Sequence, residues 1–264
     1  MSNQTVIHPS AIIHPTASIG AGCEIGPFCV IGADVELGEN CWLHNQVTIM
    51  GPSRIGSHNK FYAFCSIGQQ TQDLKYAGEP TYLQVGSGNT FREFVTVNRG
   101  TAPGAYTKIG DEGNFLAYSH VAHDCTVGNR VIFSNNGTIA GHVEVGDHAI
   151  ISGLTAVHQF CRIGSYAITG GCSKIVQDVP PYTIADGNPA KIRGLNKVAL
   201  ERHGFSPEAQ QALKDAYKLL YRSKLNLPEA LQRMEAELPQ LPEVRHFTSF
   251  LAASTRGVTR QSRA

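Results

Sequence analysis

A six-residue repeat decides the fold, and it is clearest in residues 19–32, which read IGAGCEIGPFCVIG. Ile19, Ile25 and Ile31 are each followed by glycine, and Cys23 and Cys29 stand four residues after the first two. Bulky apolar residues keep this phase from 7 to 67, from 85 to 97 and from 109 to 163. A period of six fits neither an amphipathic helix nor a half-buried strand.

The repeat is typical of a mainly β protein built as a parallel β-helix, in which three short strands form one coil of 18 residues. The apolar residue of each hexapeptide points into the coil, and the glycines mark its corners. Six of the seven cysteines share the small-residue position of the repeat, and we expect them to be buried core residues: Cys23, Cys29, Cys41, Cys65, Cys125 and Cys161.

The phase is interrupted twice, in residues 69–84 and 100–106. We expect both interruptions to be inserted loops. Insertions in such a column leave it and usually build the binding face.

The period ends near Asp186, which predicts two domains, a β-helix over residues 1–190 and an α-helical domain over 191–264. Helix starts are expected at Ser206-Pro207, Pro228-Glu229 and Pro242-Glu243. The first part has 9 Lys and Arg against 14 Asp and Glu, and the second has 13 against 7. This basic second part suits an acidic partner or a phosphorylated substrate, although it also fits an ordinary solvated helix surface.

Composition narrows the function classes. The 264 residues carry a net charge of +1 and only 16% charged residues, which argues against a nucleic-acid binder and against a disordered chain. No apolar run reaches the length of a membrane span and no signal segment is recognised, so we expect a cytoplasmic protein with reduced thiols.

Four histidines lie outside the core phase on neighbouring coils: His120, His123, His142 and His158. The 18-residue coil places His123 beneath Gly141, Gly141 beneath Gln159, and Asp124 beneath His142. Such a cluster suits a histidine general base oriented by a carboxylate, with a backbone N–H as oxyanion donor. Three of the histidines would also suit zinc, as in hexapeptide-repeat carbonic anhydrases. The spacing leaves both chemistries open and favours metal-free acyl transfer over zinc chemistry or a non-catalytic scaffold.

Longer motifs are more specific than the repeat. They are SIGQQTQDLKYAGEPT at 66–81, HVAHDCTVGN at 120–129, AGHV at 140–143, VHQF at 157–160, RHGF at 202–205 and STRG at 254–257. With these motifs the chain resembles, over essentially its full length, the UDP-N-acetylglucosamine O-acyltransferase family of lipid A biosynthesis. The later N-acyltransferase of that pathway is a rival, but it carries an N-terminal uridine-binding domain that we do not recognise here.

The resemblance implies a left-handed parallel β-helix and a homotrimer with active sites between neighbouring columns. It implies transfer of an (R)-3-hydroxyacyl group from acyl carrier protein to the glucosamine 3-hydroxyl of UDP-N-acetylglucosamine, without a cofactor or metal. The catalytic residues that it implies are His123 as general base, Asp124 as its orienting partner and Gly141 as the oxyanion donor. The substrate-binding residues that it implies are Asp73, Lys75, His120, His142, His158, Gln159, Gly171, Asn196 and Arg202.

Three positions depart from the family pattern. Asn98 replaces a common histidine, Val198 stands where a glutamate usually follows Asn196, and His203 replaces the second residue of an arginine pair. Val198 and His203 lie in the part of the chain that the resemblance assigns to nucleotide contacts, so these two departures affect the contacts that it implies. Gly171 occupies a position whose size limits acyl length in the family, and glycine there predicts a preference for a long 3-hydroxyacyl chain.

Overall fold

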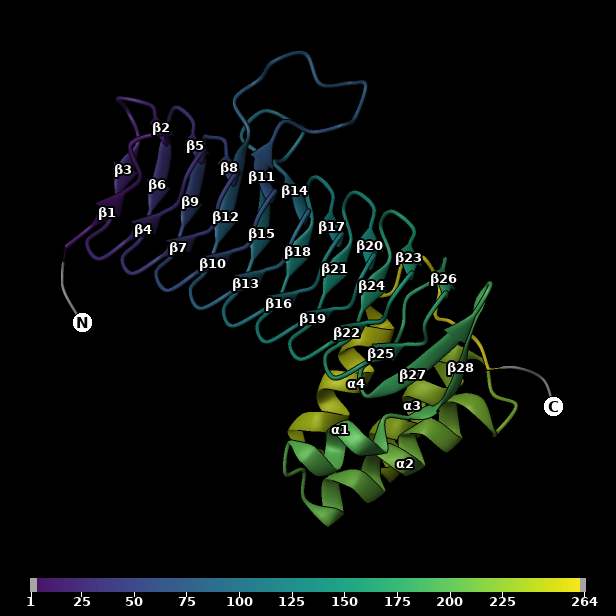
Figure 1. Cartoon of the computed structure of the whole chain (residues 1–264). Coiled ribbons are helices and arrows are strands. Elements are labelled where there is room, and N and C mark those ends of the chain that lie inside the picture. The colour runs from purple at the N-terminus through teal and green to yellow at the C-terminus, as the bar shows by residue number, and fades with distance from the viewer. Residues whose placement is uncertain (1–3, 262–264) are drawn as a thin grey trace.

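A computed structural model describes residues 4–261 and confirms the predicted left-handed parallel β-helix (Figure 1). The described strands form three sheets that run the length of the column. In spatial order, the first sheet contains β1 (Val6–Ile7), β4 (Glu24–Ile25), β7 (Trp42–Leu43), β10 (Lys60–Phe61), β13 (Thr90–Phe91), β16 (Asn114–Phe115), β19 (Ile132–Phe133), β22 (Ile150–Ile151), β25 (Ile168–Thr169), β27 (Thr183–Gly187) and β28 (Ala190–Leu195).

In the other two sheets all the neighbouring strands are parallel, whereas β27 and β28 of the first sheet are antiparallel. The second contains β2 (Ile12–Ile13), β5 (Val30–Ile31), β8 (Thr48–Ile49), β11 (Ser66–Gln69), β14 (Thr96–Asn98), β17 (His120–Val121), β20 (Thr138–Ile139), β23 (Ala156–Val157) and β26 (Lys174–Ile175). The third contains β3 (Ser18–Ile19), β6 (Val35–Leu37), β9 (Ser53–Ile55), β12 (Tyr82–Val85), β15 (Tyr106–Ile109), β18 (Thr126–Val127), β21 (Glu144–Val145) and β24 (Arg162–Ile163).

The register follows the 18-residue coil where the repeat is unbroken. Thr138 and Ile139 of β20, for example, pair with Ala156 and Val157 of β23. A side chain therefore lies directly above its equivalent one coil earlier, which is why sequence spacing alone could stack the candidate site residues.

The interior of the column is filled by the apolar residues of the repeat. Phe61, Phe91, Phe115 and Phe133 form an internal ring stack with centroids 4.8 to 5.1 Å apart, and all four are fully buried. The six predicted core cysteines are buried, whereas Cys172 is exposed. Burial raises the pKa of the Cys65 and Cys125 thiols to about 12, so both stay protonated and behave as small apolar groups.

The corners of the column are turned by residues in the left-handed region. Asp124, His142 and Phe160 have φ of 59°, 61° and 64°, and they occupy the same corner on successive coils. Other corners use the same conformation, for example at Tyr118 and Leu154. Positive φ is thus a feature of the whole column, and its presence at Asp124 and His142 does not by itself mark strain stored for function.

Both predicted insertions leave the column at one corner, where the chain passes from the second sheet to the third. Residues 70–81 connect β11 to β12, and residues 99–105 connect β14 to β15. The next coil passes from β17 to β18 at this same corner through His123 and Asp124. The longer insertion is the loop that rises above β11 in Figure 1.

Four helices follow the strands in the described part of the chain: α1 (Lys197–Arg202), α2 (Pro207–Tyr221), α3 (Leu227–Glu237) and α4 (Pro242–Ala252). The three predicted starts are confirmed, with Ser206 capping α2 and Asn226 forming a capping box on α3. The short α1 is missing from the sequence prediction. The antiparallel hairpin of β27 and β28 spans residue 190, and the division into two domains at that residue stays a prediction.

The C-terminal segment after α4 returns to the column. The fully buried Asp178 accepts a hydrogen bond from the Ser254 hydroxyl at 2.7 Å and from the backbone N–H of Arg162 at 2.9 Å, and its own N–H donates to the carbonyl of Gly257. These bonds fix residues 254–259 against the last coils. None of the helices within residues 4–261 combines the length and hydropathy that crossing a bilayer requires.

Candidate active site

The corner that carries both insertions also carries the predicted catalytic pair, and we call it the His123 corner (residues 70–81, 99–105, 122–125, 140–143 and 158–161). His123 and Asp124 follow β17, Gly141 and His142 follow β20, and Gln159 and Phe160 follow β23. The backbone N–H of His142 donates to the carbonyl of His123, and that of Phe160 to the carbonyl of Gly141. The predicted vertical stacking of these residues is therefore present.

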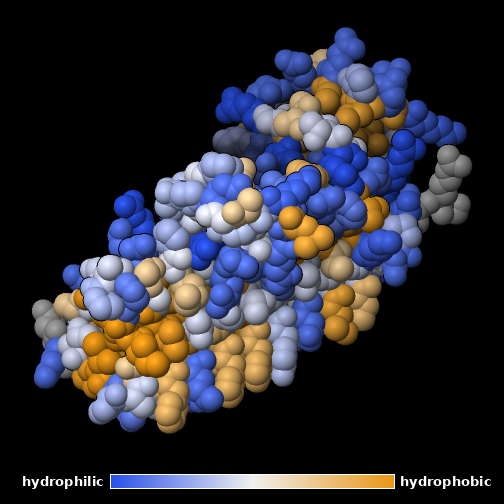
Figure 2. Space-filling view, turned by 90° about the horizontal axis from the view of Figure 1, so that it is seen from above, coloured by the Kyte–Doolittle hydropathy of each residue, from blue (hydrophilic) through white to orange (hydrophobic). Residues whose placement is uncertain are grey.

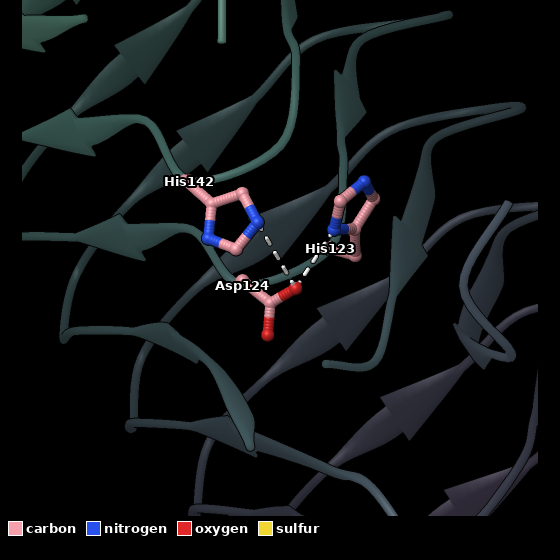
Figure 3. A group of neighbouring side chains, drawn as sticks. All are labelled: His123, Asp124 and His142. Atoms are coloured by element: carbon pink, nitrogen blue, oxygen red, sulfur yellow. Dashed lines mark hydrogen bonds and ion pairs between the residues drawn. The ribbon is translucent and has the colours of Figure 1, made fainter. Parts of the chain in front are cut away.

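His123 and Asp124 form a close pair. His123 Nδ1 lies 2.8 Å from Asp124 Oδ2, and the two side chains are only 14% and 9% exposed (Figure 3). Because the carboxylate accepts the hydrogen of Nδ1, the neutral imidazole leaves Nε2 unprotonated and able to accept a proton. The pair therefore has the geometry of a general base with an orienting carboxylate.

Asp124 is itself held from three sides. Its Oδ1 accepts the backbone N–H of Thr101 at 3.1 Å, and its own N–H donates to Thr107 Oγ1 at 2.8 Å. His142 Nε2 lies 3.7 Å from Asp124 Oδ2, and the His142 ring stacks on Phe160 with centroids 4.6 Å apart. Sequence spacing did not identify Thr101, which lies in an insertion, or Thr107, whose hydroxyl bonds to the residue 17 positions later and not to its equivalent 18 positions later.

Gly141 is in contact with the His123 imidazole. A Cβ at position 141 would lie 2.4 Å from Cε1 and 2.6 Å from Nε2 of His123. Only a residue without a side chain fits there while the ring keeps its place. Among residues 4–261 the backbone N–H of Gly141 has no hydrogen-bond acceptor, so it is available to a bound group beside His123 Nε2.

His120 lies one strand before the pair on β17. Its Nδ1 is 2.7 Å from the Thr96 hydroxyl on the coil below. Burial lowers the pKa of His120, and the nearby His123 lowers it further. A neutral His120 thus adds a polar group to the site without adding charge.

His158 and Gln159 lie one coil above Gly141, and both are exposed. Arg256 Nη2 lies 3.1 Å from His158 Nδ1, so the C-terminal segment fixed by Asp178 contributes a cation beside this predicted cleft residue. The sequence motif at 254–257 contained Arg256 but gave no reason to place it there.

The longer insertion forms a cavity of about 510 Å³ lined by Gln69, Gln70, Thr71, Gln72, Asp73, Leu74, Tyr76 and Asn98. Asp73 Oδ1 accepts the backbone N–H of Lys75 at 2.9 Å, whereas the Lys75 side chain is exposed outside this lining. Asn98, where the family commonly has histidine, is 4% exposed and donates to the carbonyl of Gln70. Asp73 therefore faces a hollow that is itself part of the His123 corner.

Three predicted substrate residues do not join this group within the described chain. Asn196 is 6% exposed, accepts the N–H of Ala199 to cap α1 and donates to the carbonyl of Tyr166. Arg202 is exposed in the last turn of α1, and Gly171 is exposed beyond β25. No hydrogen bond or ion pair joins these residues to the His123 corner within residues 4–261.

His203, which stands where the family has an arginine, packs against two aromatic side chains of the column. Its ring lies 4.5 Å from that of His148 and 5.1 Å from that of Tyr166, both on the column. His203 therefore docks α1 on the column.

A divalent cation would find three ligand atoms at the His123 corner. One atom each from His123, Asp124 and His142 lies within 4.8 Å of the others. A metal bound through Nδ1 of His123 would have to replace that nitrogen's hydrogen bond to Asp124. Two histidines and a carboxylate are common metal ligands, but the hydrogen bond between His123 Nδ1 and Asp124 is the one expected of a general base that works without a metal.

Comparison with known proteins identifies relatives of the whole chain. Residues 178–259 match the family model described as UDP N-acetylglucosamine O-acyltransferase, domain 2. LpxA from Acinetobacter baumannii is 43% identical, with 97% of this chain and 100% of that chain covered and a TM-score of 0.93.

Two further structures agree over similar lengths. UDP-N-acetylglucosamine O-acyltransferase (LpxA) from Moraxella catarrhalis is 43% identical over 96% of this chain and 99% of that chain, with a TM-score of 0.93. The Arabidopsis UDP-N-acetylglucosamine acyltransferase is 35% identical over 97% and 100%, with a TM-score of 0.86. The fold, the stacked histidine corner and these matches lead to one conclusion: the chain belongs to the UDP-N-acetylglucosamine O-acyltransferase family.

Proposed function

We propose that this protein transfers an (R)-3-hydroxyacyl group from acyl carrier protein to the 3-hydroxyl of UDP-N-acetylglucosamine, the first step of lipid A biosynthesis. The observation that carries the proposal is the His123–Asp124 pair with the His123 ring against Gly141, whose N–H has no acceptor among the described residues. Family membership supplies the substrates, and this geometry supplies the chemistry.

In the proposed mechanism, His123 Nε2 takes the proton of the sugar 3-hydroxyl as the oxygen attacks the carbonyl carbon of the acyl thioester. The tetrahedral intermediate carries an oxyanion, which the N–H of Gly141 stabilises, and one such donor lowers the barrier by about 2.7 to 4 kcal/mol. The intermediate then expels the carrier thiol, which takes its proton from His123. Asp124 stabilises the imidazolium between the two proton transfers.

The cavity beside Asp73 is our candidate for the acceptor sugar. Asp73 lines it and can accept hydrogen bonds from sugar hydroxyls. We assign further substrate contacts to His120, His142, His158 and Gln159, which lie on the same coil as His123 or on the next two coils. The basic residues of the C-terminal part, 13 Lys and Arg against 7 Asp and Glu, suit an acidic carrier protein.

We infer a homotrimer with the active site between neighbouring columns. Within residues 4–261, Asn196 and Arg202 have no hydrogen bond or ion pair with the His123 corner, so we assign them to the site of a neighbouring copy. An apolar corner of the column, formed by Phe64, Phe94, Tyr118 and Leu154, offers a surface for that copy. These four side chains are 41% to 62% exposed, and the first three rings are stacked. Figure 2 shows hydrophobic residues along one long edge of the column and at its N-terminal end.

One experiment tests the reaction. Purified protein is incubated with UDP-N-acetylglucosamine and a panel of 3-hydroxyacyl carrier proteins, and the product is identified by mass. His123→Gln should remove nearly all turnover, whereas His14→Gln at an exposed position should not change it. Full activity of the His123 variant would rule out its role as base, and loss of wild-type activity on treatment with a chelator would favour a metal-dependent reaction.

The oligomeric state has a separate test. Phe94→Glu should convert the trimer to smaller species in sedimentation velocity, because a charge would be buried in the interface. Lys60→Glu, an exposed change on the first sheet, is the matched control. A Phe94 variant that remains trimeric would show that this corner is not the contact.

A further inference from the structure

The two insertions contact each other through a pair of hydroxyl groups. Thr71 Oγ1 of the first lies 2.8 Å from Thr101 Oγ1 of the second, and Thr71 is 5% exposed. Their loops leave the column on neighbouring coils at the His123 corner. The two threonines are 30 residues apart with a full coil between them, so this contact exists only in the folded chain.

The hydroxyl pair is the middle of a continuous series of bonds. On one side, the backbone N–H of Asp73 donates to Thr71 Oγ1 at 3.1 Å. On the other side, the N–H of Thr101 donates to Asp124 Oδ1 at 3.1 Å, and Asp124 Oδ2 holds His123. The proposed sugar-binding residue and the proposed general base are therefore joined by a short path of hydrogen bonds.

We propose that Thr71 and Thr101 are positioning residues that couple the Asp73 loop to the His123–Asp124 pair. This inference rests on the proposed function. Asp124 uses one oxygen for His123 and the other for Thr101, so a displacement of Thr101 turns the carboxylate and with it the imidazole. Threonine is suited to this task because its branched side chain has few rotamers and its hydroxyl is well fixed. Sugar bound at Asp73 then stabilises the aligned form of the base.

Other bonds hold the ends of both insertions. The N–H of Arg99 donates to the carbonyl of Gln69, and that of Gly104 to the carbonyl of Pro80, each at 2.8 Å. Removal of the hydroxyl pair should therefore leave the fold and the loop connections in place. The pair can be tested without unfolding the site.

The test compares Thr71→Val, Thr101→Val and the double variant with Thr71→Ser as the conservative replacement. Thr81→Val is the matched control, since Thr81 is the last residue of the same loop and its buried hydroxyl has no hydrogen-bond partner among the described residues. A single buried hydrogen bond typically changes an equilibrium about 2- to 10-fold. We expect each valine variant to lower kcat by a factor in that range and to raise KM for UDP-N-acetylglucosamine, with Thr71→Ser close to wild type.

The double variant should be no worse than Thr71→Val alone, because Thr71→Val already removes the hydroxyl pair together with the acceptor of the Asp73 N–H, and Thr101→Val removes only the hydroxyl pair. A rise in KM with kcat unchanged would mean that the loop only binds sugar, and it would overturn the coupling. Additive losses in the double variant would also overturn it.

A second measurement needs no substrate, so it separates this inference from the proposed reaction. Amide hydrogen exchange followed by mass spectrometry should be faster in both 70–81 and 99–105 in the Thr71→Val protein, and unchanged in Thr81→Val. Faster exchange in the first insertion alone would show that the two loops are not coupled. If the wild-type protein turned over no hydroxyacyl donor, this result would still decide whether the coupling exists.

Discussion

Gly141→Ala is the sharpest test of the candidate site, because it adds one methyl group directly against the proposed base. The new Cβ would lie 2.4 Å from His123 Cε1 and 2.6 Å from Nε2. This is about 1 Å closer than ordinary carbon contacts allow. The backbone at 141 does not have a positive φ, so alanine itself is tolerated and the ring must move.

The magnitude follows from that displacement. His123 Nδ1 is 2.8 Å from Asp124 Oδ2, and a ring shift of about 1 Å away from Gly141 would lengthen or misalign this bond. Misplacement of a reacting group by about 1 Å can cost about 100-fold in rate. The loss of a hydrogen bond of about 1 kcal/mol is offset by the lower entropy of alanine in the unfolded chain, about 0.4 to 1 kcal/mol. We therefore expect kcat to fall at least about 100-fold with stability nearly unchanged.

The assay measures kcat with saturating UDP-N-acetylglucosamine and hydroxyacyl carrier protein, together with the free energy of unfolding. Gly194→Ala is the matched control, because a Cβ there would meet nothing within 4 Å. Gly141→Ala protein with wild-type kcat would refute the argument, since the ring could then leave its observed place without loss. An unfolded variant would refute the claim that only the ring must move.

Three further predictions follow from the structure. Burial holds the pKa of His120 below its usual value, so below about pH 6.5 the unfolded chain binds a proton at His120 that the folded chain does not, and stability falls. Between pH 8 and 5 the melting temperature should fall less steeply in His120→Gln than in the wild type. An identical pH dependence of the two melting temperatures would contradict this. Asp178→Ala leaves the buried N–H of Arg162 and the Ser254 hydroxyl without their acceptor. We expect the free energy of unfolding, measured by chemical denaturation, to fall by about 2 to 3 kcal/mol, and proteolysis near residues 254–259 to become faster. An unchanged rate of proteolysis there would show that Asp178 does not hold this segment. A Cβ at Gly171 would meet only the carbonyl of Gly153 at 3.5 Å, so Gly171→Met should fill open space and shift the donor preference in a chain-length panel towards shorter acyl groups; equal use of ten-carbon and longer donors by the wild type would refute a long-chain preference.

The vertical stacking of the site could be predicted because the column is periodic. Coils of 18 residues place His123, Gly141 and Gln159 above one another whatever the other details of the chain. The contact between Gly141 and the His123 ring and the 3.7 Å approach of His142 to Asp124 both follow from that register. Local periodicity was sufficient here, since no long-range packing had to be known.

The insertions were predicted as loops but not as partners of the site. Thr101 and Thr71 are separated from Asp124 by insertions of irregular length, so no repeat counts them into place. The nucleotide contact that the resemblance implies for Asn196 stays a prediction, but the sequence did not show that Asn196 also caps α1 and donates to the carbonyl of Tyr166. The capping role of Asn196 depends on α1 beginning at Lys197, and α1 was not predicted from the sequence.

By itself, the sequence determined the coil, its core residues, the helix starts and the set of side chains that share the His123 corner. These properties depend on neighbours one turn or one coil away, and a period encodes them. Only the tertiary structure decided that the two insertions meet at Thr71 and Thr101, and that the C-terminal segment returns so that Arg256 reaches His158. It also decided that Asn196 and Arg202 lie apart from the His123–Asp124 pair. Those contacts join segments far apart in the chain, and they form because buried groups such as Asp178 must find hydrogen-bond partners wherever the folded chain supplies them.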